Sequence, residues 1–219
     1  MIELMCGPDN DIRLLSISIP ENTETSNVIL VGFTGGIDSS FLLYLVAKLN
    51  SVQKIPFIIQ PITIGDLERI EYIPKIIEFI KLETNQLIND TILIDVDNTL
   101  PMNRQIKNMY YQYFNSSKNH KLFFLGDTEH PPNLRVNYLR NFPKYKKLNQ
   151  PFKNLNKSHV IDAMIKLNLE ELINIVPRCP RYHKYGNSPC ANFFCKERRW
   201  AYSLLKRPDL LEKFISKDK

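Results

Sequence analysis

The segment at residues 33–40 carries residue types that can bind a polyphosphate. Two adjacent glycines let the backbone turn tightly and approach a ligand closely. Hydroxyl side chains beside them can donate hydrogen bonds to phosphate oxygens, and a carboxylate can orient the loop or reach a Mg²⁺ ion that the phosphates carry. The predicted nucleotide-binding residues are Phe33, Thr34, Gly35, Gly36, Ile37, Asp38, Ser39 and Ser40.

The elements around this segment support the same interpretation. Residues 28–33 form a short apolar run rich in branched side chains, which is typical of a strand covered on both faces. Residues 39–49 have a broad apolar face and predict a helix. The first amides of a helix lack intrahelical partners and carry partial positive charge, so phosphate oxygens suit them. An ordinary Gly-Gly turn with a polar helix cap is the alternative.

Strands and helices alternate along the first two thirds of the chain, which predicts an α/β fold. Strands are expected at 12–19, 28–33, 55–64, 91–96 and 121–126, with Pro56 and Pro61 limiting the third. Helices are expected at 39–49, 72–82 and 103–114. This order favours a Rossmann-like parallel sheet with helices on both faces. Residues 1–126 would form the nucleotide-binding core.

The chain changes character after Gly126. Residues 127–156 are basic and rich in Pro and Asn, and a loop of this length is usually functional. No Asp or Glu lies between His130 and Ile161, so this stretch is either a solvated basic surface or a lid or groove that faces phosphate. Ser158 is expected to cap a helix, and two short helices follow at 196–205 and 208–216. Residues 127–219 would form the substrate and lid region of the same compact unit.

Bulk properties agree with a globular protein that binds anions. The chain has 219 residues, 43% of them hydrophobic and 24% charged, and a net charge of +6, which suits nucleotides or RNA. No apolar run approaches the roughly 18 residues that span a bilayer. The N-terminus lacks the pattern of a signal peptide, so a cytoplasmic protein without a membrane partner is expected.

Cysteines cluster near the C-terminus, in a small Cys-bearing segment. Clustered cysteines in a cytoplasmic protein often hold a metal, and structural zinc takes four ligands. Unrelated reduced cysteines and a redox pair are the other interpretations. The candidate zinc ligands are Cys179, His183, Cys190 and Cys195.

The segment Thr34-Gly35-Gly36-Ile37-Asp38-Ser39-Ser40 resembles the S-G-G-x-D-S motif of the PP-loop ATP pyrophosphatases, with Thr in place of the leading Ser. The resemblance implies that ATP and Mg²⁺ bind here and that a carboxyl or carbonyl oxygen is adenylated with release of pyrophosphate. A nucleophile such as ammonia or sulfur then displaces AMP. Asp38 and Ser39 would be the catalytic residues, through electrostatics and positioning.

The last quarter of the chain resembles the C-terminal region of 7-cyano-7-deazaguanine synthases, the PP-loop enzymes of queuosine biosynthesis. Pro151-Phe152-Lys153-Asn154-Leu155-Asn156-Lys157 leads into a helix as in that family. Cys179, Cys190 and Cys195 match three zinc ligands of the family, whereas Ala191 replaces a glycine and one cysteine is missing. The resemblance therefore implies zinc only with a substitute ligand such as His183.

This resemblance implies an ATP-dependent ligase that forms a C–N bond. The expected partners are a small carboxylate, either 7-carboxy-7-deazaguanine or a related acid, and ammonia. Asp127 and Glu129 would either read donor groups on a purine-like ring or be plain surface carboxylates. The alternatives are a PP-loop enzyme that modifies tRNA by thiolation or ligation, and a non-catalytic nucleotide-binding homologue associated with defence or phage.

Overall fold

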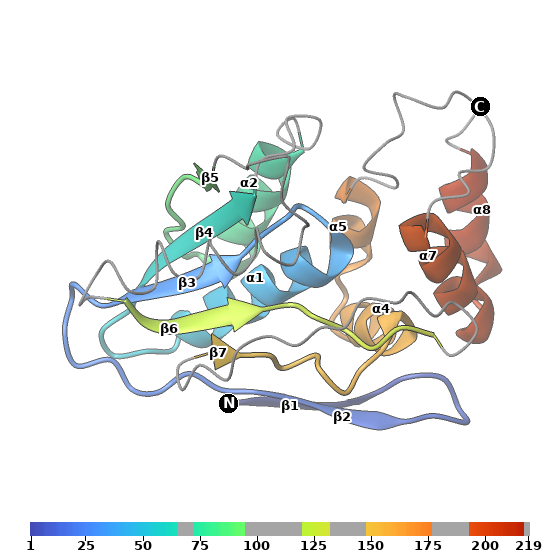
Figure 1. Ribbon diagram of the computed structural model, residues 1–219, viewed down its shortest axis with the longest axis horizontal. Coiled ribbons are helices and arrows are strands. Elements are labelled where there is room, and N and C mark those ends of the chain that lie inside the picture. Colours follow the sequence, from blue (N-terminus) through green and yellow to red (C-terminus); the bar gives the residue numbers. More distant parts are fainter. Residues whose placement is uncertain (65–71, 95–119, 132–147, 177–192, 217–219) are drawn as a thin grey trace, which may run out of the picture.

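A parallel β-sheet forms the centre of the protein. The computed structural model describes residues 1–64, 72–94, 120–131, 148–176 and 193–216 (Figure 1). The strands of this sheet follow the order β5-β4-β3-β6-β7, and every neighbouring pair is parallel. The α/β, Rossmann-like fold expected from the sequence is therefore confirmed. The strands are β3 (Val28–Gly32), β4 (Ile58–Ile64), β5 (Ile92–Ile94), β6 (His120–Leu125) and β7 (Leu148–Asn149).

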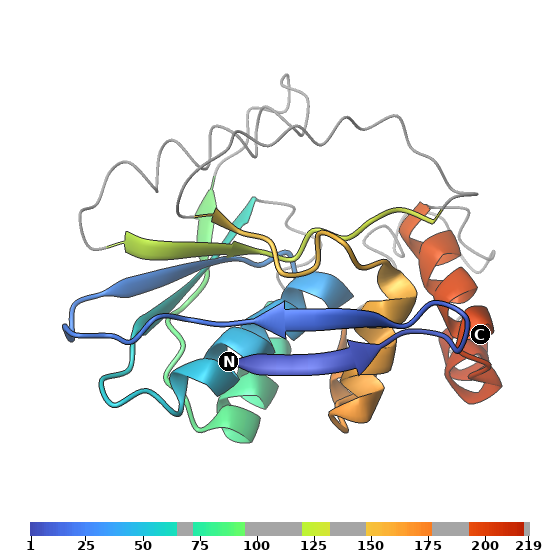
Figure 2. The ribbon, with the colours of Figure 1, turned by 90° about the horizontal axis from the view of Figure 1, so that it is seen from below.

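The described helices cover one face of this sheet (Figure 2). Alternate residues of β3 supply the two faces: Val31 packs against the helices, and Leu30 joins a smaller cluster with Ile62 and Phe123 on the other face. The helix expected at 103–114, which would cover that second face, lies outside the described residues. The helices behind the first face are α1 (Ile37–Asn50), α2 (Ile73–Thr84), α4 (Lys157–Lys166) and α5 (Glu170–Ile175).

A two-stranded antiparallel hairpin at the N-terminus packs beside α4. Its strands are β1 (Ile2–Cys6) and β2 (Arg13–Ile17), and Met5 pairs with Leu14. The amide of Gly7 donates to Asp162 Oδ2 at 2.8 Å, and Lys166 Nζ donates to the carbonyl of Met5 at 3.0 Å. The sequence predicted β2 but not β1, in which four of the five side chains are half-buried or exposed.

Strand β4 runs through Pro61, contrary to the expectation that this proline limits it. In a parallel strand, the N–H and C=O groups of one residue both point toward the same neighbouring strand, and those of the next residue point toward the opposite neighbour. The carbonyl of Ile62 accepts from Phe33 N on the β3 side at 2.8 Å, so Pro61 points toward β5. The pairing of β4 with β5 begins only at Ile62, so the missing N–H of Pro61 removes no ladder bond.

Helix α4 begins at Lys157, and its N-cap is Asn156 rather than Ser158. The Asn156 side chain accepts from the amides of Ser158 and His159, and the Asn156 amide donates to His159 Nδ1 at 3.2 Å. This reciprocal pair is a capping box with histidine in the place that Glu or Gln usually takes. Ser158 lies in the first turn and donates its hydroxyl to Asn156 Oδ1 at 2.6 Å.

We expect His159 to make the stability of the protein depend on pH below neutrality. The ring is fully buried, its Nε2 lies 2.9 Å from the carbonyl of Asp11, and burial lowers its pKa even though Asp11 opposes the shift. The unfolded chain therefore binds the proton more tightly than the native protein. Stability is complete above the unfolded pKa of about 6.5 and falls below it, by at most about 1.4 kcal/mol per pH unit for one proton.

Urea unfolding between pH 8 and pH 5 measures this dependence, and His159→Gln is the matched variant. Glutamine can accept the Asn156 amide at the same capping position but does not titrate. The variant should unfold with a smaller difference between pH 7 and pH 5.5 than the parent protein. Equal differences would show that His159 is not the titrating group.

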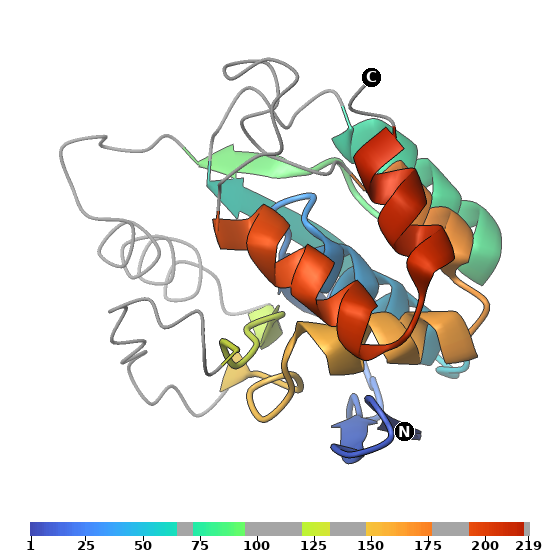
Figure 3. The ribbon, with the colours of Figure 1, turned by 90° about the vertical axis from the view of Figure 1, so that its right-hand side faces the viewer.

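Two C-terminal helices complete the described structure. They are α7 (Phe193–Leu204) and α8 (Pro208–Ser216), which lie against each other, and α7 also packs on α4 (Figure 3). Both helices were expected, and α7 begins three residues earlier than expected, at Phe193 instead of Lys196. Among the described helices, none has the length and apolar character that crossing a bilayer requires.

Candidate active site

The loop that joins β3 to α1 lies at the point where the order of the sheet reverses. The chain moves from β3 to β4 on one side, whereas β6 pairs with β3 on the other side. Open α/β sheets bind ligands in the crevice beyond the carboxyl ends of the strands at such a point. Gly35 and Gly36 therefore stand where this fold places ligands.

Side chains of the loop hold its backbone in shape. Ser39 Oγ accepts from the amide of Thr34 at 3.1 Å and donates to the carbonyl of Gly36 at 3.1 Å. The two hydroxyl oxygens of Thr34 and Ser39 lie 3.2 Å apart. Ser39 thus closes the loop from within, while Thr34 is exposed at its tip.

Most amides at the start of α1 remain open. Gly35 has a φ of +68°, which favours glycine, and Gly36 is the N-cap residue with no side-chain cap. Ser40 N is the first amide of the turn with a backbone acceptor, the carbonyl of Gly36 at 2.9 Å. Within the residues that the structure describes, the amides of Gly35, Ile37, Asp38 and Ser39 have no hydrogen-bond acceptor. These donors, together with the helix dipole, can receive an anion.

The other predicted loop residues are placed by the core. Phe33 and Ser40 are fully enclosed and Ile37 is buried, so their side chains lie beneath the loop. At the end of β6, Gly126 lies against the first turn of α1. A Cβ atom at Gly126 would lie 3.0 Å from the Asp38 carbonyl and 3.2 Å from Ser39 N. A glycine is thus needed there to let the strand end approach the loop.

Lys157 is the buried cation of this site. Its ammonium group forms an ion pair with Asp38 Oδ2, and only 6% of the Lys157 side chain is exposed. Asp38 stands in the first turn of α1, and its Oδ1 is buried without a hydrogen-bond partner. The Lys157 ammonium group therefore stands at the first turn of α1, where it offsets the charge of the Asp38 carboxylate.

The segment before α4 fixes this position. The ring of Phe152 stacks on Phe41 of α1 with a centroid distance of 5.6 Å, and Phe152 is fully buried. The Leu155 carbonyl accepts from the amide of Glu129 at 2.7 Å, which ties the segment to the chain that leaves β6. Lys157 follows directly as the first residue of α4.

A second carboxylate approaches Lys157 from α7. Glu197 Oε2 lies 3.7 Å from Lys157 Nζ, and Glu197 Oε1 lies 3.8 Å from His130 Nδ1. Only 3% of the Glu197 side chain is exposed, against 20% for Asp38. Four elements distant in the sequence, namely the loop, the chain after β6, α4 and α7, thus contribute titratable groups to one cluster.

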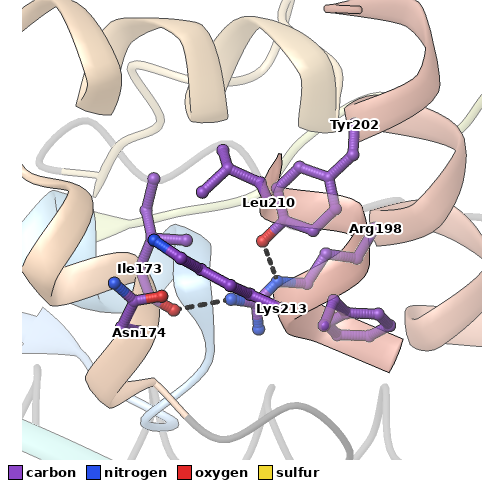
Figure 4. Close-up of a pocket in the computed structure, with 7 residues that line it drawn as sticks. Ile173, Asn174, Arg198, Tyr202, Leu210 and Lys213 are labelled. Atoms are coloured by element: carbon purple, nitrogen blue, oxygen red, sulfur yellow. Dashed lines mark hydrogen bonds between the residues drawn. The ribbon is translucent and has the colours of Figure 1, made fainter. Parts of the chain in front are cut away.

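Arg198, the next residue of α7, serves the packing of the C-terminal helices. Its Nη2 donates to the Ile173 carbonyl at the end of α5, and its Nε donates to Tyr202 Oη, both at 2.7 Å (Figure 4). The guanidinium also lies over the ring of Phe214, 5.2 Å from its centroid. The small hollow around these residues is also lined by Asn174, Leu210 and Lys213.

Two sequence expectations concern residues elsewhere. Glu129 Oε2 accepts from Arg13 Nη1 at 2.7 Å, so its carboxylate is held by β2 in a partly exposed ion pair. Of the predicted zinc ligands, Cys195 is a buried cysteine on α7. The other three, Cys179, His183 and Cys190, lie outside the described residues, and zinc stays a prediction.

Sequence reasoning selected the loop but not the cluster behind it. Lys157 entered only as one of several basic residues and as the start of the helix that resembles the deazaguanine synthases. That resemblance was the available signal for Lys157. Glu197 entered only within the helix after Cys195 that resembles the same family, and His130 only as the start of the stretch without acidic residues.

No family model matches the sequence, and no curated protein matches it either. Two solved structures are similar to the fold, each with a TM-score of 0.44. One is the U34-tRNA thiolase NcsA from Methanococcus maripaludis with its [4Fe-4S] cluster, at 15% identity over 89% of this chain and 72% of that chain. The other is NMN synthetase from Francisella tularensis, at 14% identity over 88% and 84%. At these scores neither similarity assigns a family, and the proposal below rests on residues of this chain.

Proposed function

We propose that this chain is a PP-loop ATP pyrophosphatase that activates a carboxylate with ATP and transfers the acyl group to ammonia. The observation that carries the proposal is the set of open amides at the start of α1, placed at the switch point of the sheet beside the buried Lys157. Amides and an ammonium group together can neutralise a polyphosphate. The sequence resemblance supplies the reaction class.

The proposed reaction proceeds in two balanced steps. A carboxylate oxygen attacks the α-phosphorus of ATP, the bond from this phosphorus to the bridging oxygen breaks, and pyrophosphate leaves with the electron pair. The ammonia nitrogen then attacks the acyl carbon, the bond to AMP breaks, and the nitrogen loses a proton to water. The loop amides and Lys157 would stabilise the charge that grows on the leaving pyrophosphate.

Asp38 and Ser39 have different parts in this proposal. Ser39 holds the loop closed through its contacts with Thr34 and Gly36, so it acts by positioning. Asp38 pairs with Lys157 through one oxygen, and its other oxygen, buried and unpartnered, suits a Mg²⁺ ion that arrives with ATP. Such an ion would supply further charge neutralisation for the phosphates.

Product analysis of the purified chain tests the proposal. With labelled ATP, ammonium and 7-carboxy-7-deazaguanine, we expect stoichiometric AMP and pyrophosphate, and we expect neither when the acid is omitted. A panel of related carboxylates would identify a different acid. Release that requires tRNA but not ammonium would favour the tRNA-modifying alternative. Tight ATP binding without turnover under any condition would support a non-catalytic nucleotide-binding protein.

A further inference from the structure

Glu197 belongs to the C-terminal helices, yet its carboxylate lies beside the candidate phosphate site. Its two oxygens face two different basic side chains, Lys157 at 3.7 Å and His130 at 3.8 Å. Burying a single carboxylate costs on the order of several kcal/mol unless an opposite charge compensates it. If this position served only to pack the core, an apolar residue would be more stable there than Glu197.

The burial of Glu197 favours a role through Lys157 over a contact of its own with the nucleotide. Asp38 belongs to the loop itself and is partly exposed, whereas Glu197 stands on α7 and is almost completely enclosed. Both carboxylates approach the same ammonium group of Lys157. A lysine side chain has several rotatable bonds and loses rotamer freedom when it is fixed, so the two contacts decide where its charge lies.

We propose that Glu197 is a positioning residue, which holds the Lys157 ammonium group against the loop so that it meets the β- and γ-phosphates of ATP. The inference rests on the proposed function for the role of Lys157. Through Glu197, α7 would become part of the phosphate site by way of Lys157, without a contact between Glu197 and the ligand.

Several contacts fix Glu197 in this place. Arg198, its neighbour, ties α7 to the end of α5 and to Tyr202, and Phe193 at the start of α7 meets the ring of His130 edge-on at 4.9 Å. Helix α7 therefore has a defined rotation about its axis, with Glu197 toward Lys157. A carboxylate on such a rigid element can set the position of a flexible partner.

Nucleotide binding measured by calorimetry tests the inference, with ATP and AMP as probes in the presence of Mg²⁺. Glu197→Gln keeps the size of the side chain but removes its charge. We expect this variant to bind ATP roughly tenfold or more weakly, the loss given by one charge-assisted contact. AMP lacks the two outer phosphates, so the affinity for AMP should change less than about threefold. This bound is the usual size of the effect of a substitution that removes no contact. Glu197→Asp should recover part of the ATP affinity.

A double variant distinguishes positioning from a general effect on the fold. If Glu197 acts through Lys157, then Glu197→Gln should weaken ATP binding no further once Lys157→Met is present. Glu212→Gln, on the exposed face of α8, is the control and should bind both nucleotides normally. A loss of fold would weaken ATP and AMP equally, and thermal unfolding of each variant would reveal it.

Three results would overturn the inference. They are normal ATP binding by Glu197→Gln, equal losses for ATP and AMP, and losses that multiply in the double variant. Each of these leaves the proposed function intact if the parent protein binds ATP. Failure of the parent protein to bind ATP would instead remove the proposed function and this inference with it.

Discussion

Replacing Lys157 with methionine is expected to weaken the binding of Mg-ATP by about 100-fold or more, which is the upper range for one charge-assisted hydrogen bond. The variant loses the only cation that contacts Asp38 in the described part of the site. It also leaves the carboxylates of Asp38 and Glu197 without their shared partner, so that their negative charge opposes the incoming phosphates. Isothermal titration calorimetry with Mg-ATP measures the effect.

The matched control is Lys153→Met, four residues earlier. Lys153 belongs to the same basic stretch but is exposed, so it can attract phosphate only through screened, long-range charge. We expect at most a twofold change for this variant at physiological salt, in line with the small effect of an exposed charge. Similar losses for both variants would mean that the basic stretch steers phosphate as a whole and that Lys157 has no special position.

Gly36→Ala is expected to weaken Mg-ATP binding by about tenfold or more while leaving thermal stability unchanged, because a methyl group would separate the ligand from amides that are each worth about 1 kcal/mol or more. The fold itself does not require glycine at this position. Gly36 has a φ of −79°, which any residue adopts, and among the described residues an added Cβ atom would come within 4 Å of Thr34 Oγ1 alone, at 3.4 Å. The proposed close approach of a phosphate group would explain a glycine here.

Gly35→Ala separates this effect from backbone strain. Gly35 has a φ of +68°, so an alanine there should destabilise the protein by about 1 kcal/mol or more through strain alone. Its added Cβ atom would lie at ordinary contact distance, 3.6 Å, from Ile73. A Gly36→Ala variant with unchanged ATP affinity would contradict the placement of phosphate over this turn.

The strand–loop–helix unit could be predicted because its determinants are local. The apolar run of β3 specifies a strand buried on both faces, and the glycines after it permit the turn. The many apolar residues of α1, which is buried on nearly all sides, then favour a helix inside the core. Each of these properties depends on neighbouring residues, and the alternation with β4 and α2 extends the same reasoning to a parallel sheet.

Other features were missed because distant residues decide them. The sequence suggested that Pro61 ends a strand. In the sheet, however, the backbone of Pro61 points away from β3, and β5 pairs with β4 only from Ile62 onward, so the missing N–H of Pro61 costs no hydrogen bond between strands. Ser158 is a good N-cap by residue type, but Asn156 is the N-cap residue of α4. The ring of His159 accepts a hydrogen bond from the Asn156 amide, and the other ring nitrogen lies next to the carbonyl of Asp11 in the N-terminal hairpin. Local preference lost to tertiary contacts in both cases.

The amino-acid sequence by itself predicted the strands β3, β4, β5 and β6 and the turn after β3, because short-range backbone geometry and apolar periodicity encode them. The binding of polyphosphate at that turn stays a prediction. Only the tertiary structure decided which charges stand beside the turn. Lys157 is 119 residues from Asp38 and reaches it because α4 packs on α1, and Glu197 reaches Lys157 because α7 packs on α4. Buried charges need partners, and nothing in the local sequence of a charged residue states which partner the folded chain will provide.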